Sequence, residues 1–235
     1  LLPSLNIVYD LTQHSLLRFS AAKVMARPPL AYLAAATSVT VNGNRRLVTT
    51  GNPELEPFRA TSLDLSYEWY PSPNGIVSVG LFYKDISTYI QNLTHIAPYS
   101  TTDLPVSLLA NTGAAATDDF SISTVINTPG GPLQGIELAY QQPFRFLPGF
   151  WSRFGTTINY TLVASKLTYQ TTSAAGAATV RAYLLNLSRN SYNATLYYDD
   201  GRLQARVSTN YRDKYITGVP GSFSADASGV NPASY

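Results

Sequence analysis

The sequence predicts an all-β fold: an antiparallel transmembrane β-barrel segment of about eight strands, with short turns at one end and long loops at the other. Three observations predict it: runs of alternating apolar and polar residues, connections of two contrasting lengths, and a low content of charge. Only 13% of the 235 residues are charged, whereas soluble domains carry roughly 25%. No run approaches the roughly 18 apolar residues of a membrane-spanning helix.

Alternation of period two identifies the strands, because successive side chains of a strand point to opposite faces. In residues 62–69, for example, Leu63, Leu65, Tyr67 and Trp69 share one face, and serines and carboxylates occupy the other. In chain order, the predicted strands are residues 5–9, 16–23, 62–69, 77–84, 135–142, 153–162, 192–198 and 203–212. Within residues 77–84, Phe82 is the one misfit, an aromatic residue on the polar face. Most of these runs are close in length to the about 9–11 residues that a tilted strand needs to cross a bilayer.

The connections between these runs alternate in length. The short ones contain Pro, Asn, Asp and Gly, as tight turns require, and cover residues 11–15, 71–75, 143–151 and 199–201. The long ones cover residues 26–59, 92–133 and 165–181. Because successive antiparallel strands reverse direction, all short turns fall at one end of the sheet. Outer-membrane barrels have this pattern, with short periplasmic turns and long extracellular loops.

Aromatic residues gather beside the short turns, where a membrane interface would lie. The predicted interfacial girdle consists of Trp69, Tyr70, Phe144, Phe146, Phe150, Trp151, Tyr197 and Tyr198. Soluble β-sandwiches also have alternating strands. The low charge, the one-sided loop lengths and the small neutral residues of the polar faces favour the membrane barrel instead.

Several classes of function are disfavoured by composition. The net charge is +2 and no cluster of Lys and Arg occurs, so we expect no nucleic-acid partner. The chain has no cysteine, which excludes disulfides and thiolate metal sites. His14 and His95 lack carboxylates at metal-ligand spacing. We therefore expect no enzyme, no metal and no cofactor.

One segment resembles a known family. Residues 51–90 are similar to the C-terminal part of the barrel of TonB-dependent outer-membrane receptors. The matching positions are Asn52, Pro53, Leu55, Pro57, Glu68, Phe82, Tyr83, Lys84 and Asp85. Residues 18–30, 131–149 and 158–166 fit the same family in the same order.

The resemblance implies active import of a scarce solute, such as a siderophore or a carbohydrate, across the outer membrane of a Gram-negative bacterium. It implies a barrel of about 22 strands closed by a plug domain, with outer-membrane lipid, TonB–ExbB–ExbD and a small-molecule ligand as partners. Residues 1–235 would form part of one such barrel domain, and the chain shows no plug sequence or TonB box. We expect an internal piece of a larger receptor, because about eight strands cannot close around a plug.

Polar and aromatic residues of the long loops and the upper barrel interior are the candidate ligand contacts. They are Tyr32, Asn42, Asn44, Arg45, Arg46, Tyr99 and Asp103 in the loops, and Lys84, Arg18 and Arg212 in the interior. Aromatic rings with amides suit sugars, and paired arginines suit an anionic siderophore. A passive porin and, less strongly favoured, a soluble β-sandwich binding module are the alternative functions.

Overall fold

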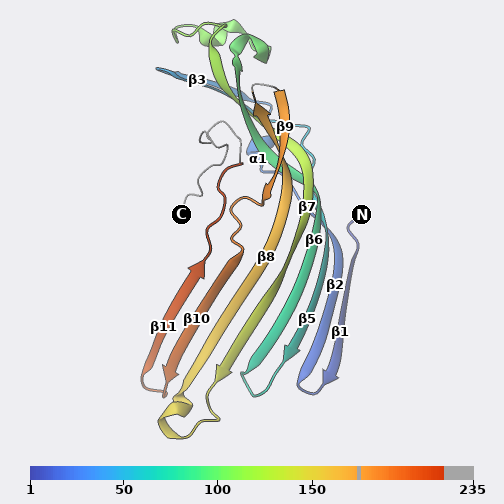
Figure 1. Ribbon diagram of the computed structural model, residues 1–235, viewed down its shortest axis with the longest axis vertical. Coiled ribbons are helices and arrows are strands. Elements are labelled where there is room, and N and C mark those ends of the chain that lie inside the picture. Colours follow the sequence, from blue (N-terminus) through green and yellow to red (C-terminus); the bar gives the residue numbers. More distant parts are fainter. Residues whose placement is uncertain (174–175, 220–235) are drawn as a thin grey trace.

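A computed structural model describes residues 1–173 and 176–219 and consists mainly of one curved, open sheet (Figure 1). Within the described residues, eight strands follow one another in the order β1-β2-β5-β6-β7-β8-β10-β11, each antiparallel to the next. They are β1 (Ser4–Thr12), β2 (Ser15–Ala26), β5 (Phe58–Trp69), β6 (Ile76–Pro98), β7 (Asp119–Pro143), β8 (Phe154–Ser173), β10 (Asn190–Asp199) and β11 (Gln204–Arg212).

The eight strands predicted from alternation are these eight, so the predicted fold class is confirmed. Their register aligns the apolar faces across the sheet: Leu65 lies opposite Phe19 on β2 and opposite Leu81 on β6. The short connections predicted between these eight strands all lie at one end, which we call the turn end, at the bottom of Figure 1. The longest of them contains the 3₁₀ helix η3 (Gly149–Arg153).

The opposite end, which we call the loop end, is more ordered than predicted. The three segments predicted as long loops contain β3 (Thr37–Asn42), β4 (Arg45–Thr50), β9 (Gly176–Tyr183) and extensions of β6, β7 and β8. Short helices α1 (Leu30–Leu33), η1 (Tyr99–Thr102) and η2 (Val106–Leu109) complete this end. The prediction missed these strands because their alternation is short and is embedded in Ala, Ser and Thr.

The additional strands attach to the main sheet at two places, and one of these attachments is non-local. β3 and β4 form a hairpin, and β4 pairs in parallel with the start of β7, from Leu47 opposite Ser121 to Thr50 opposite Thr124. β9 pairs with the outer part of β8. Figure 1 shows both elements above the main sheet, beyond the eight-stranded region.

Buried apolar residues are concentrated at the loop end. One cluster joins the β3–β4 hairpin to β7 and comprises Val48, Tyr99, Leu109, Phe120 and Ile122. A second contains Leu167, Tyr169, Ala182 and Val219, and a third contains Leu55, Ile90 and Val125. None of the helices among the described residues is long and apolar enough to cross a membrane.

Candidate functional site

The large apolar residues of the eight-stranded region are exposed along one face of the sheet. Phe19, Leu65, Leu81, Ile136 and Leu162 lie side by side on five neighbouring strands. Leu65 and Leu81 are 40% and 47% exposed. The next row toward the turn end continues with Tyr67, Val79, Leu138, Tyr160 and Tyr192. A continuous apolar surface of this size indicates a lipid-facing wall, and we call it the apolar belt.

The belt ends at a common level on the loop side. Lys23 lies opposite Thr61, Thr61 opposite Asp85, and Asp85 opposite Pro132. On β8, the last residue paired with β7 is Ser165, opposite Leu133, and Lys166 is the next residue along the strand. Charged side chains therefore begin at one row across the sheet, as expected where a membrane core ends.

Aromatic rings mark the other border of the belt, at the turn end. Phe150 packs against Trp151, Phe154 and Tyr198 with ring centroids 5.7, 5.2 and 5.4 Å apart. Trp69 is 45% exposed on the apolar face, and Phe144 contacts Phe146. Two residues of the predicted girdle turn toward the polar face: the Tyr70 hydroxyl donates to Glu68, and the Tyr197 ring covers Gly155.

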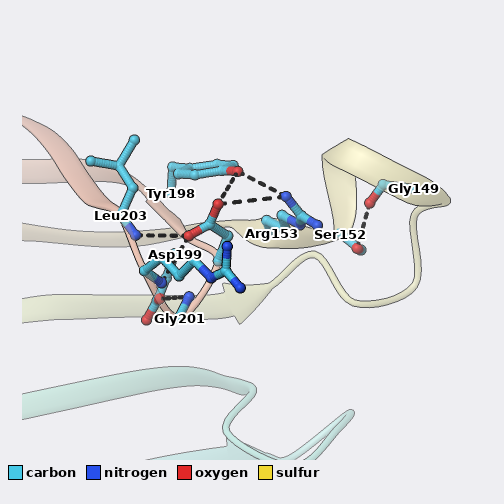
Figure 2. A network of polar contacts seen from close by, with 9 residues as sticks. Gly149, Ser152, Arg153, Tyr198, Asp199, Gly201 and Leu203 are labelled. Carbon is cyan, nitrogen blue, oxygen red and sulfur yellow. Dashed lines mark hydrogen bonds and ion pairs between the residues drawn. The ribbon is translucent and has the colours of Figure 1, made fainter.

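A polar network ties the η3 connection to the β10–β11 turn beside these rings (Figure 2). Arg153 donates to the Tyr198 hydroxyl at 3.2 Å and forms an ion pair with Asp200 at 3.6 Å. The Asp200 carboxylate also accepts hydrogen bonds from the backbone N–H groups of Leu203 and Arg202, at 2.7 and 2.9 Å. These backbone donors, together with Tyr198 and Arg153, lower the pKa of Asp200.

The opposite, polar face of the sheet carries hydrogen-bonded charge. Arg18 donates to Glu68 at 2.8 Å, and Ser20 and Ser62 both donate to Asp64. Toward the loop end, Lys84 and Glu137 line a depression of about 500 Å³ together with Asp64 and Thr161. A polar face of this kind is typical of a barrel interior.

The predicted ligand residues occupy several separate places. Asn42, Asn44 and Arg45 are exposed together at the tip of the β3–β4 hairpin. Arg46 points instead to Asp118, with 2.9 Å between Nη2 and Oδ2. Asp103 and Lys84 are exposed at two other positions.

The other predicted ligand residues make internal contacts. Tyr99 is 1% exposed and its hydroxyl donates to the Pro105 carbonyl. Tyr32 packs against the cluster around Leu55. Arg212 donates to Ser188 and to the Asn186 carbonyl and lies 4.3 Å from the Tyr215 ring centre. Arg18 is paired with Glu68, as described above.

A pocket near the ends of β9 to β11 was missed in the sequence. It measures about 690 Å³, and its lining includes Tyr183, Arg189, Tyr211, Arg212 and Tyr215. Ser165 also lines it, and its hydroxyl is buried without a hydrogen-bond partner. The only signal in the sequence was the density of Tyr, Arg and Lys in residues 181–189 and 211–215.

The apolar belt, the polar face and the one-sided turns together define a segment of an outer-membrane transport barrel. A family model described as "TonB dependent receptor-like, beta-barrel" matches residues 1–235, and the chain belongs to this family. The resemblance found in the sequence is thereby confirmed. Members of the family are outer-membrane transporters of Gram-negative bacteria. A search of curated protein sequences found no match.

Solved receptor structures share the fold at low sequence identity. The siderophore receptor PirA from Acinetobacter baumannii is 20% identical, with a TM-score of 0.60 over 97% of this chain and 32% of PirA. A mutant ferric enterobactin receptor (PfeA) from Pseudomonas aeruginosa, in complex with enterobactin, is 17% identical, with a TM-score of 0.60 over 91% of this chain. The chain spans 28% of the length of that receptor.

Proposed function

We propose that this chain is part of a receptor that imports a siderophore by TonB-dependent transport. The observation that carries the proposal is the family match over the whole chain, on a sheet with one lipid-type face and one interior-type face. The solved siderophore receptors with the same fold support this choice of solute. Carbohydrates are the alternative class of solute, because the exposed amides at the hairpin tip also suit sugars.

The proposed receptor is larger than these 235 residues. Residues 1–235 form part of a single barrel domain in the outer membrane, and a plug domain on another segment fills the interior. The two edge strands, β1 and β11, have nine residues each, and all of these residues are exposed. Exposed edges of this kind support pairing with further barrel strands. TonB–ExbB–ExbD acts on the plug to open the path.

We assign first contact with the solute to the exposed polar residues of the loop end. Asn42, Asn44 and Arg45 are exposed together at the tip of the β3–β4 hairpin, which extends sideways beyond the sheet (Figure 1). Asp103 and Lys84 are further proposed contacts. Arg18, Arg46, Tyr32, Tyr99 and Arg212 contribute indirectly, since each already packs or bonds within the chain.

Uptake by the bacterium that carries the gene tests the proposal. Deleting the gene is expected to abolish uptake of at least one ferric siderophore from a panel labelled with radioactive iron, and the wild-type gene restores it. The uptake should also stop when the proton gradient is collapsed. Uptake that persists without the gradient would indicate a passive porin, and selective loss of oligosaccharide uptake would indicate carbohydrate import.

A further inference from the structure

We propose that the loop-side border of the apolar belt binds a lipid that carries a phosphate group. The site combines a cationic depression with an apolar groove on the same outward face. It rests on the assignment of the apolar belt to lipid and is independent of the solute that the receptor imports.

The lining of the depression, among the residues that the structure describes, has three cations and no acidic side chain. Lys166, Arg181 and Arg189 line a volume of about 250 Å³ together with Gln134 and Tyr183. Lys166 lies opposite Tyr183 in the β8–β9 pair, and Arg181 lies two residues before Tyr183 on the same face of β9. The ammonium of Lys166 lies 5.5 Å from the Tyr183 ring centre. Arg181 and Arg189 make no side-chain hydrogen bond or ion pair within the described parts of the chain.

These charges favour a phosphate over a neutral ligand. Guanidinium groups bind phosphate oxygens through paired hydrogen bonds, and an ammonium adds a point charge. Two carboxylates lie near the depression. Asp85 lies opposite Pro132, which is part of the lining. Asp213 accepts hydrogen bonds from Asn190 and Tyr211 and also interacts electrostatically with Arg189.

An apolar groove begins where the depression ends. It measures about 470 Å³ and runs across the belt between Leu65, Leu81, Ile136 and Leu162. Gln134, Ala164 and Arg189 line both the groove and the depression. A molecule with a phosphate at one end and an acyl chain at the other matches both parts, whereas inorganic phosphate would fill only the first.

The location agrees with this occupant. Lys166 begins the charged row at which the belt ends, and the depression lies directly beyond Ala164 and Gln134. Lipid phosphates lie at the border of the membrane core, where basic side chains attract them.

Native mass spectrometry of the protein expressed from its natural gene tests the site. The protein is purified in mild detergent and offered a phosphorylated lipid or the same lipid without its phosphate. Replacing Lys166, Arg181 and Arg189 by Gln is expected to reduce retention of the phosphorylated lipid on the order of tenfold or more. A control removes three cations elsewhere: Arg45 at the hairpin tip, and Lys84 and Arg206 on the polar face.

Each outcome bears on the proposal. Loss of the phosphorylated lipid in the triple variant, with retention in the control, supports it. Equal retention in both variants overturns it, and so does equal retention of the two lipids by the wild type. Full displacement of the lipid by inorganic phosphate alone would show that the groove holds no acyl chain and would also overturn it. The single variant Arg181→Gln, on an exposed hairpin face, provides the same comparison if the triple variant does not fold.

Discussion

The inward-facing aromatic residues interrupt the polar face for a local reason. Phe82 and Tyr197 lie opposite glycines on the neighbouring strands, Gly135 and Gly155. Each ring occupies the space where a Cβ atom of that glycine would project. Phe82, the misfit of the alternation, therefore covers a gap in the sheet rather than marking a change of face, and pairs of this kind strengthen glycine positions in sheets.

Substitution of Gly135 tests this explanation. A Cβ at Gly135 would lie 2.5 Å from Phe82 Cζ and closer still to the Leu162 carbonyl oxygen. We expect Gly135→Ala to destabilise the protein by about 1–3 kcal/mol through overpacking, measured by urea unfolding of the protein folded into lipid vesicles. Gly80→Ala is the matched control on the adjacent strand, because its Cβ would meet Glu137 Cβ at 3.8 Å. Equal effects of the two substitutions would contradict the account.

The Asp200 network predicts a pH dependence at the turn end. Because the folded pKa of Asp200 is lowered from 3.8, its carboxylate stabilises the turn above the unfolded pKa, and this contribution is lost as pH falls through the lower folded pKa. Above the unfolded pKa, Asp200→Asn should speed amide hydrogen exchange at Arg202 and Leu203, and the difference from wild type should shrink as pH falls through the lowered folded pKa. Asp103→Asn, at the other end of the sheet, should leave both amides unchanged, and an effect of equal size would argue against the network.

Candidate site residues were harder to predict than strands because their environment is set by distant segments. Tyr99 has the composition and loop context of a ligand contact, yet Phe120 and Val48 bury it. Arg46 is neighboured in sequence by exposed Arg45, but the parallel pairing of β4 with β7 brings it to Asp118. Neither partner can be inferred from local sequence.

At the scale of elements, strands of the wall were predictable and those of the loop end were not. The sequence of residues 62–69 alternates clearly, because one side of this strand contacts lipid and the other side a polar interior. In β9, by contrast, one face packs on Tyr89 through the Leu167 and Tyr169 cluster, and its sequence of mainly Ala, Thr and Val gives little contrast. Packing between segments, not alternation, fixes these strands.

A buried glutamine is predicted to hold the β8–β9 hairpin against β6. Gln91 is 4% exposed; its Nε2 donates to the Gln170 carbonyl at 2.6 Å and its Oε1 accepts from the Gln170 N–H at 2.9 Å. Gln91→Ala leaves both backbone groups unsatisfied, which costs about 1–3 kcal/mol. We expect faster hydrogen exchange through Gly176–Tyr183. Gln141→Ala, at the turn end, is the control, and unchanged exchange in the Gln91 variant would refute the role of this bridge.

At the scale of the whole molecule, the sheet separates two solvents. Its stability in lipid depends on keeping charge off the apolar belt, whereas the polar face tolerates it. Neighbouring residues of one strand sample the two environments: Leu65 lies in the belt, and Ser66 lies between Arg18 and Gly80 on the polar face.

A lysine at each of these positions should have very different effects. Leu65→Lys is expected to destabilise the folded protein by about 2–4 kcal/mol if the position lies near the bilayer midplane, and Ser66→Lys by less than about 1 kcal/mol. Asp64 and Glu68 flank the new charge at position 66 on the same face. Unfolding in vesicles measures both values, and equal tolerance would count against the orientation of the sheet.

The most direct test of the account is a cysteine scan of residues 62–69, which is straightforward because the chain contains no cysteine. Each single-cysteine variant, expressed from the natural gene and folded into vesicles, is labelled with a small fluorophore and exposed to quenchers in the lipid acyl chains or in water. The account predicts lipid quenching at positions 63, 65, 67 and 69, and its absence at 62, 64, 66 and 68. Quenching without this period of two, or confined to the even positions, would contradict the assignment of the apolar belt to the membrane.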